Sequence, residues 1–579
     1  MIHAVLQYAF YIAILILLAI PLGKYIAKVM NGEKVLLSRV LVPCEKQIYK
    51  ILRIRPEEQM TWKTYALSVF LFSGLGFMIL FLLHLLQGVL PLNPQSVPGT
   101  SWHLAFNNAS SFVTNTNWQS YSGESGLSYF TQMLGLTVQN FVSAATGIAV
   151  LFALIRGFVR TGTKELGSFW VDMTRIILYI LLPLSIIVSV LLVSQGVVQN
   201  FKTYETVQLL EPVVLEDGTR VTQQLVPMGP AASQIAIKQL GTNGGGFFGV
   251  NSAHPFENPN AVSNIIEMIS LLWIPAALCF TFGRNVKDKR QGRAIFIAML
   301  IMLVLALTCI AVNEHLATPQ LAGNGEVNIT ATDQAGGNME GKEARFGIAS
   351  SSAWAAFTTA ASNGSVNSMH DSYTPLGGMI TMLQMQLGEV IFGGTGCGLY
   401  GMLAFALLAV FIAGLMVGRT PEYLQKKIEP FEMKMAVVAC LATPVVILTG
   451  SGLASVMPFM TENLNNSGAH GFSEILYAYS SAGGNNGSAF AGLSANNVFI
   501  NVSLGLIMLA ARFVPIVAVL AVAGSMAKKK KIATTPGTLS TCNPMFIGLL
   551  IFVVLLIGAL SFFPALALGP VAEFFQMIG

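Results

Sequence analysis

Long apolar runs recur along this 579-residue chain and constrain its fold more than any other feature. Each is long enough to cross the roughly 30 Å hydrocarbon core of a bilayer as a helix. Charged residues make up only 10% of the chain, against about 25% in soluble domains. The sequence therefore predicts an all-α integral membrane protein with ten transmembrane helices. They are expected at residues 3–27, 64–90, 127–155, 171–197, 260–283, 292–313, 376–417, 435–457, 494–526 and 543–568.

The first and the seventh of these runs differ from the others. Residues 1–13 contain no lysine or arginine, unlike the start of a signal peptide, so we expect the first run to be a retained span. The run 376–417 is too long for one straight helix and contains Gly393–Gly396. Because unwound backbone inside a membrane is tolerated where protein or a cavity surrounds it, we expect this run to bend or unwind there.

Lysine and arginine gather in alternate connections between the runs. Of the 32 in the chain, 26 lie in five such connections, five lie in the others, and Arg512 lies inside a predicted span. Since cytoplasmic loops of membrane proteins are enriched in these residues, the 26 should face the cytoplasm and both termini should face outward. The net charge of +5 then reflects topology and not binding of nucleic acid.

The outward connections contain an internal repeat. A compact polar signature with asparagine or glycine stands between two long spans at Val113–Gln119, Leu240–Gly246, Ala361–Asn367 and Gly483–Ser488. Alignment superimposes Asn115, Thr242, Ser362 and Asn485, then Thr116, Asn243, Asn363 and Asn486, then Asn117, Gly244, Gly364 and Gly487. The repeat predicts four span–re-entrant loop–span units around a pseudo-fourfold axis. The units are residues 62–160, 161–283, 284–418 and 419–531, flanked by a first span with its cytoplasmic loop (1–61) and a last span (532–579).

The composition of these loops suggests what they bind. Short helices, expected near 103–114, 230–241, 350–361 and 471–482, would point their carbonyl ends at the axis. Glycine lets the backbone turn carbonyls toward an ion, and Asn, Thr and Ser add neutral side-chain oxygens. Because no carboxylate occupies an aligned position, the ring suits a monovalent cation, with potassium as the best candidate, better than a divalent one. The alternative is four ordinary polar turns at the membrane surface.

Two charged residues lie at membrane depth. Arg512 is expected to act as an electrostatic barrier or tether beneath the loops, or to form a structural ion pair, because a charge inside a membrane requires a polar cavity or a partner. Glu389, beside the glycine break, is expected to line a side path for the ion, to form a hydrogen bond at a helix end or to pair with a basic residue.

Three acids follow the signatures and should lie near the outer mouth, where they would attract cations, or be ordinary exposed acids: Glu124, Glu257 and Asp371. Three histidines lack the spacing of metal ligands and should form hydrogen bonds: His84, His254 and His370. The polar stretch 323–345 is expected to be an external loop.

The signatures carry a family resemblance. Through Thr114–Gln119, Gly241–Phe248, Ser362–Asp371, Gly418–Tyr423 and Asn485–Phe490, the chain closely resembles the A subunits of the Kdp potassium-transporting P-type ATPase, within the potassium transporter superfamily. The resemblance implies a potassium-binding, channel-like subunit of the bacterial cytoplasmic membrane. It also implies that K⁺ passes from the filter sideways toward the pump, along a route near Arg512 and Glu389.

The resemblance further implies partners: an ATP-hydrolysing B subunit, a single-span C subunit and a small membrane peptide, the F subunit, all embedded in lipid. The chain itself has neither a GxxxxGK[ST] phosphate loop nor a DKTGT phosphorylation sequence, so we expect a non-enzymatic subunit without an organic cofactor. Two alternatives stay open at this point. One is a stand-alone potassium carrier or channel, and the other is a scaffold subunit that carries no ion.

Overall fold

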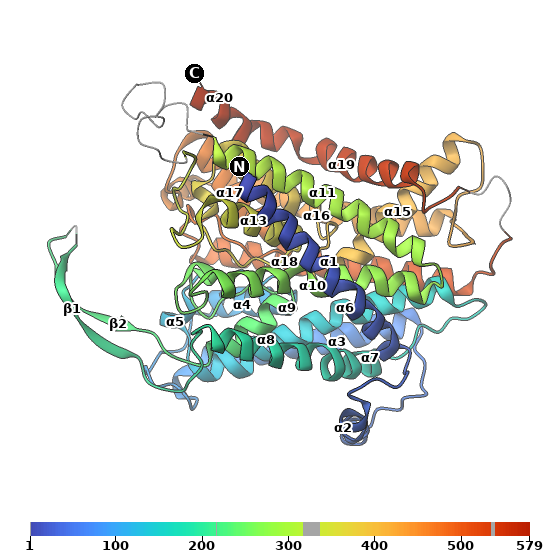
Figure 1. The fold of residues 1–579 in the computed structure, drawn as a ribbon, viewed down its shortest axis with the longest axis horizontal. Coiled ribbons are helices and arrows are strands. Elements are labelled where there is room, and N and C mark those ends of the chain that lie inside the picture. The colour runs from blue at the N-terminus through green and yellow to red at the C-terminus, as the bar shows by residue number, and fades with distance from the viewer. Residues whose placement is uncertain (1, 216, 317–335, 534–538, 579) are drawn as a thin grey trace.

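The computed structural model describes residues 2–215, 217–316, 336–533 and 539–578. Long helices run side by side through most of the molecule (Figure 1). Within the described residues, ten helical segments are long and apolar enough to span a membrane, which confirms the predicted all-α membrane fold. These segments are Ile2–Met30, Trp62–Val89, Thr131–Val159, Phe169–Ser194, Ala261–Asn285, Lys289–His315, Cys397–Met416, Pro430–Ser455, Val498–Lys528 and Pro544–Ile578.

The named elements divide into four units and two flanking spans. The first span is α1 (Ile2–Met30), and the last comprises α19 (Pro544–Leu566) and α20 (Ala572–Ile578). Unit one contains α3 (Trp62–Leu86), α4 (Trp102–Val113), α5 (Gly123–Gly126) and α6 (Val138–Val159), and unit two contains α7 (Phe169–Arg175), α8 (Leu182–Ser194), α9 (Ala231–Leu240) and α10 (Ala261–Asn285). Unit three contains α11 (Lys289–His315), α13 (Gly347–Ala360), α14 (Pro375–Gln386) and α15 (Cys397–Met416), and unit four contains α16 (Pro430–Ser455), α17 (Gly468–Gly483) and α18 (Val498–Lys528).

The units meet in a closed cyclic order. In every unit the re-entrant helix packs against the span that precedes it, in the pairs α3–α4, α8–α9, α11–α13 and α16–α17. Each also contacts the second span of the preceding unit. Thus α9 contacts the π-helical turn Thr131–Thr137 that leads into α6, α13 contacts α10, α17 contacts α14, and α4 contacts α18. One relation repeated four times is what a pseudo-fourfold arrangement requires.

The seventh apolar run is broken where its glycines predict. Helix α14 ends at Gln386, α15 begins at Cys397, and the ten residues between them are not helical. Gly393 and Gly396 have φ of +44° and +89°, which a residue with a side chain rarely adopts. The irregular segment is buried in protein, as unwound backbone at membrane depth must be.

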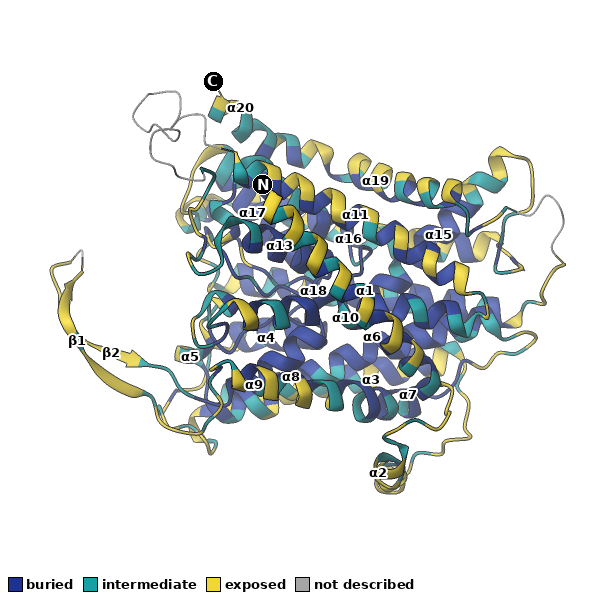
Figure 2. Cartoon of the chain, in the orientation of Figure 1, coloured by how far each residue is buried: buried dark blue, intermediate teal, exposed yellow. Residues whose placement is uncertain are grey.

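The burial pattern is that of a protein embedded in a lipid bilayer. Buried residues fill the interior, while exposed residues line the outer helices, including α1 and α19 (Figure 2). Many of these exposed residues are apolar, for example Leu17 of α1 and Leu560 of α19. Helix α1 packs on α10 through small residues, since a Cβ at Gly23 would come within 2.5 Å of the Ala277 carbonyl oxygen.

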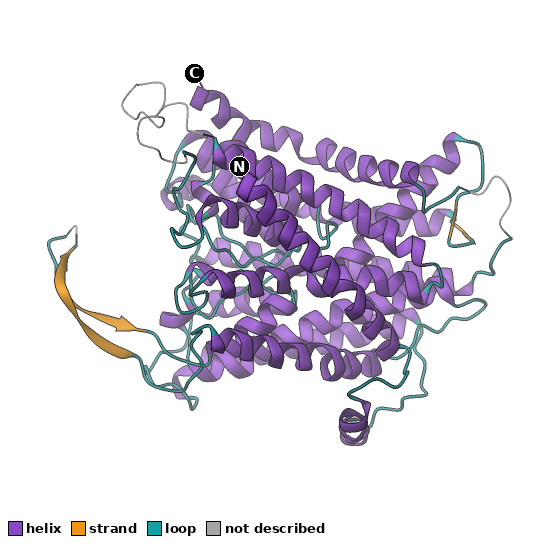
Figure 3. Cartoon of the chain, in the orientation of Figure 1, coloured by secondary structure: helices purple, strands orange, loops and turns teal. Residues whose placement is uncertain are grey.

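Two peripheral elements were not predicted from the sequence. Helix α2 (Ser38–Ile51) follows the first span, and strands β1 (Glu205–Val214) and β2 (Arg220–Val226) form an antiparallel hairpin. The hairpin projects from the helical body and accounts for most of the strand structure, the rest being the short pair β3 (Glu422–Tyr423) and β4 (Lys426–Lys427) (Figure 3). The two chain ends lie at the same end of the bundle as β1 and β2, and α2 lies at the opposite end (Figure 1). An even number of crossings requires both termini on one side.

Candidate functional site

The four signatures begin where the four re-entrant helices end. Helices α4, α9, α13 and α17 stop at Val113, Leu240, Ala360 and Gly483, close to the predicted ends. The N–H at the second aligned position always donates to the carbonyl five residues earlier: Thr116 to Ser111 (2.9 Å), Asn243 to Lys238 (2.8 Å), Asn363 to Thr358 (3.0 Å) and Asn486 to Ser481 (2.9 Å). This is the Schellman arrangement, which turns the chain sharply away from a helix.

The backbone conformation of the four loops is also shared. The first aligned position is left-handed in every loop, with φ of 68° at Asn115, 51° at Thr242, 48° at Ser362 and 47° at Asn485. The third is left-handed as well, with φ of 55° at Asn117, 80° at Gly244, 97° at Gly364 and 99° at Gly487. The second position has negative φ throughout. The aligned positions therefore have one structure as well as one pattern.

This conformation costs free energy at the residues that have side chains. A left-handed residue other than glycine loses roughly 1–2 kcal/mol, and a β-branched residue such as Thr242 is unusual there. Such strain persists only where surrounding structure over-determines the backbone. Its recurrence at one position of all four loops identifies these loops as the candidate functional site.

Glycine allows three neighbouring loops to touch. A Cβ placed on Gly244 would overlap the carbonyl oxygen of Asn363, one on Gly364 would overlap that of Asn486, and one on Gly487 would overlap that of Thr116. All three approaches are closer than the 3.0 Å that real Cβ atoms keep. Loop two therefore contacts loop three, loop three contacts loop four, and loop four contacts loop one.

Asparagine side chains join the remaining pair. The Asn115 amide donates to the carbonyls of Gly241 (3.2 Å) and Thr242 (2.9 Å), and the Asn243 amide donates to the Asn115 side-chain oxygen (2.6 Å). The four loops thus form a closed ring. Asn117 stands at the one third position without glycine, and its side chain lies against Gly245 of loop two.

Several side-chain oxygens that the sequence assigned to an ion are engaged within the ring. The Asn363 oxygen accepts from the Ser365 N–H (2.9 Å), and the Asn486 oxygen accepts from the Ser488 N–H (3.0 Å). Three other buried oxygens have no hydrogen-bond partner in the described part of the chain: those of Asn117, Asn243 and Ser362. The neutral atoms available to a cation are therefore chiefly backbone carbonyls together with these three.

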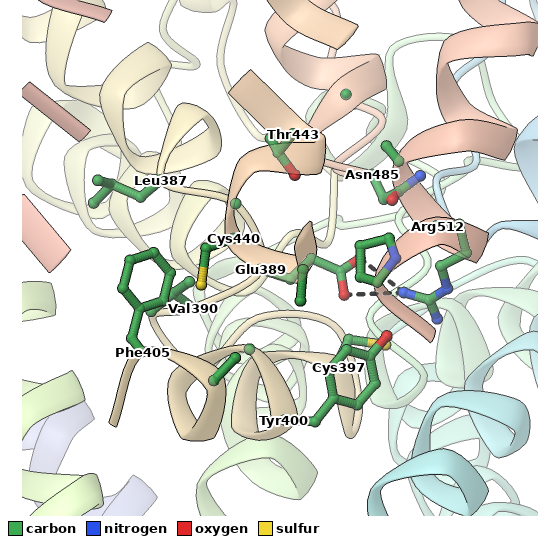
Figure 4. Close-up of a pocket in the computed structure, with 17 residues that line it drawn as sticks. Leu387, Glu389, Val390, Cys397, Tyr400, Phe405, Cys440, Thr443, Asn485 and Arg512 are labelled. Atoms are coloured by element: carbon green, nitrogen blue, oxygen red, sulfur yellow. Dashed lines mark hydrogen bonds and ion pairs between the residues drawn. The ribbon is translucent and has the colours of Figure 1, made fainter. Parts of the chain in front are cut away.

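An ion pair lies beside the ring in the glycine break. Arg512 Nη1 donates to both carboxylate oxygens of Glu389, at 2.8 and 2.9 Å. The pair lines a small pocket of about 40 Å³ between α15, α16 and α18 (Figure 4). Asn485 of loop four also lines it, so the pocket reaches the ring. The structure thus brings the two predicted charges together as one ion pair beside the ring.

The outer acids differ in their surroundings. Glu124 is half-buried, its carboxylate accepts from the Gly249 N–H (2.7 Å), and burial raises its pKa. Asp371 is half-buried and contacts His470 at 2.9 Å. The prediction for Glu257 is wrong: this acid is fully buried and pairs with Lys238 of α9, so it presents no charge to the outer mouth.

The three histidines form hydrogen bonds, as predicted. His84 Nε2 contacts the Asn108 amide, and His370 Nδ1 lies 2.7 Å from the Tyr477 hydroxyl. His254 Nδ1 accepts from the Phe256 N–H (3.1 Å). Burial and the charge of Arg345 lower the pKa of His254 to about 4. Of the predicted external stretch, residues 323–335 lie outside the described residues. Arg345 folds back to donate to the Asn258 carbonyl (3.2 Å).

The family described as "Potassium-transporting ATPase A subunit" matches residues 9–575. The chain belongs to this family. It is 73% identical over 579 residues to the potassium-transporting ATPase potassium-binding subunit of Clostridium botulinum (strain Eklund 17B / Type B), covering all of both chains. It is 64% identical over 575 residues to the protein of that name from Desulfovibrio desulfuricans, covering 99% of each chain.

A solved structure supports the fold of this A subunit. The potassium transporter TrkH from Vibrio parahaemolyticus superposes with a TM-score of 0.51, covering 87% of this chain and 96% of that one. At 13% identity the likeness concerns the fold alone. It confirms that the chain has the repeated-unit architecture predicted from its four signatures.

Sequence reasoning about the A subunit missed the buried network behind loops two and three. The sequence places Lys238 in an outward connection and only Arg512 inside a span, yet Lys238 is fully buried in α9. Its ammonium contacts Glu257. The Ser252 hydroxyl lies between two carboxylates, with Oγ 2.9 Å from Glu257 Oε1 and 2.7 Å from Glu267 Oε2. The available signal was a lysine inside a predicted re-entrant helix, where a charge requires a partner.

Proposed function

We propose that this chain is the potassium-binding and translocating subunit of an ATP-driven potassium uptake complex. In this proposal the ring of Asn115–Asn117, Thr242–Gly244, Ser362–Gly364 and Asn485–Gly487 is a selectivity filter for extracellular K⁺. The names of the relatives, which are potassium-binding subunits, support the choice of ion.

The single observation that carries the proposal is the closed ring with one repeated backbone conformation. Four helix carbonyl ends converge on it, and each brings partial negative charge. Rings of backbone carbonyls replace the hydration shell of a monovalent cation in channel filters. The twelve aligned residues contain no carboxylate, which divalent cations would favour.

We further propose that the ion leaves sideways. The pocket beside Asn485 extends between α15, α16 and α18, and the Arg512 guanidinium is held at its wall by Glu389. A fixed positive charge beneath a cation filter opposes straight passage to the cytoplasm. The lateral pocket is then the entrance to the route toward a partner subunit.

The remaining parts of the proposal concern the complex and its membrane. ATP hydrolysis belongs to a P-type B subunit, with a single-span C subunit and a small membrane peptide F as further partners. The complex lies in the bacterial cytoplasmic membrane. The distribution of lysine and arginine supports an orientation with both termini outside.

The deciding experiment is the ion dependence of ATP hydrolysis by the purified complex, with potassium compared with rubidium and sodium. The proposal expects activation by potassium at low concentration and none by sodium at that concentration. A stand-alone channel would instead leak potassium from vesicles that contain only this chain. A scaffold subunit would leave potassium affinity unchanged in Gly244→Asp, whereas we expect a marked loss because the carboxylate crowds and charges the ring.

A further inference from the structure

A second cluster of titratable side chains lies apart from the ring, near the end of the bundle that carries both termini. Asp371 follows loop three, His470 and Glu474 lie one turn apart at the start of α17, and Glu573 lies on α20. One ligand atom from each of Asp371, His470 and Glu474 lies within 4.8 Å of the other two. The cluster therefore joins loop three and the fourth re-entrant helix at one point.

The hydrogen bonds of the imidazole give the cluster a defined geometry. His470 Nδ1 lies 2.7 Å from Glu573 Oε1, and Nε2 lies 2.9 Å from Asp371 Oδ1. Metal-binding histidines commonly donate the N–H of one nitrogen to a carboxylate, which fixes the tautomer and directs the other nitrogen at the ion. Glu573 is placed to accept the N–H of Nδ1, and Nε2 then faces the Asp371 carboxylate, with Glu474 in the same cluster.

Glu474 provides independent evidence that a ligand belongs here. Its side chain is 0% exposed, and Oε1 accepts from the Asn466 amide at 2.8 Å. Its other oxygen, Oε2, is buried and has no hydrogen-bond partner among the described residues. A buried carboxylate oxygen without a partner is costly unless a proton or a cation occupies the space beside it.

We propose that Asp371, His470 and Glu474 form a binding site for a divalent transition-metal ion such as Zn²⁺, with Glu573 as the residue that orients His470. One imidazole nitrogen and two carboxylate oxygens are a common donor set for such ions, whereas Ca²⁺ and Mg²⁺ take mostly oxygen ligands. The bound ion would fasten the segment after loop three to the fourth re-entrant helix and, through Glu573, to the C-terminal helix. This site is separate from the proposed potassium filter and does not depend on it.

The test uses the full-length chain, purified in detergent and stripped of metal with a chelator. Titration calorimetry with Zn²⁺ should show one saturable site per chain. His470→Gln and Glu474→Gln should each weaken binding more than 100-fold, because each removes a ligand. Glu573→Gln should keep one site but weaken it about 10- to 100-fold, the usual effect of losing a partner of a ligating histidine.

A matched control and a spectroscopic readout make the result decisive. His315→Gln removes a half-buried histidine that bonds the Ala311 carbonyl, so Zn²⁺ binding should not change. Co²⁺ in place of Zn²⁺ should give a visible absorption band that disappears in His470→Gln. Size-exclusion profiles identify any variant that fails to fold. The proposal is overturned if the unaltered chain binds no Zn²⁺, or if folded His470→Gln and Glu474→Gln bind it as tightly as the unaltered chain.

Discussion

Replacing Gly244 by alanine should weaken potassium binding through a steric contact that the structure defines. Two terms contribute. At φ of +80° alanine pays roughly 1–2 kcal/mol for the left-handed backbone. Its Cβ would also overlap the Asn363 carbonyl oxygen and approach Ser365 N to 2.6 Å, and overpacking of this kind costs roughly 1–3 kcal/mol. Because loop three must move to relieve the overlap, the second term acts on the ring itself.

Gly196→Ala is the matched control. Gly196 has φ of +97°, but nothing lies within 4 Å of its would-be Cβ, so this variant carries the backbone term without the overlap. The assay is the potassium concentration that half-activates ATP hydrolysis by the purified complex. At about 1.4 kcal/mol per tenfold, the overlap alone should raise that concentration about 5- to 150-fold in Gly244→Ala relative to Gly196→Ala. Equal half-activating concentrations in two folded variants would refute the assignment of Gly244 to the filter.

Three further predictions concern charged and titratable groups. Arg512→Gln leaves Glu389 uncompensated and should cost about 3–5 kcal/mol of unfolding free energy. Adding Glu389→Gln to this variant should restore the lost stability in thermal unfolding, but potassium transport should stay altered if Arg512 acts on the ion. Normal transport kinetics in Arg512→Gln would remove Arg512 from the mechanism. Lys238→Met should lower the unfolding temperature far more than Lys202→Met at an exposed lysine, because Lys238→Met leaves the buried Glu257 carboxylate without its partner. His254 faces Arg345 and has a pKa of about 4 in the folded state, against about 6.5 in the unfolded chain. The protein should therefore become less stable as pH falls from about 6.5 to 4, because the unfolded chain takes up a proton on His254 before the folded protein does. His254→Gln should flatten this pH dependence in unfolding scans.

The spans and the re-entrant helices could be predicted from the sequence because both follow from local properties. Length and hydrophobicity locate a crossing helix, and the observed α4 (Trp102–Val113) differs by one residue at each end from the predicted 103–114. The glycine break was predictable for the same reason, since Gly393 and Gly396 permit backbone that other residues resist.

The pairing of buried charges could not be predicted in this way. Lys238 and Glu257 lie 19 positions apart in a segment that folds back on itself, so only the tertiary structure brings them together. The β1–β2 hairpin was missed for a different reason. Its side chains are mostly exposed on both faces, so the sequence shows no alternating hydrophobic pattern there. The two strands are held together mainly by backbone hydrogen bonds.

As the proposed filter, the ring of loops would hold potassium without a carboxylate. Five left-handed residues with side chains cost several kcal/mol together, and contacts with the neighbouring loops hold the loops in place. In the proposed filter the carbonyls are fixed before the ion arrives, so binding would require little reorganisation. A carboxylate would bind more strongly, but conduction requires an ion to leave as readily as it enters. Neutral oxygens held in place by a strained backbone would let the ion both bind and leave. The free energy of the left-handed residues is what positions these oxygens without a charged group.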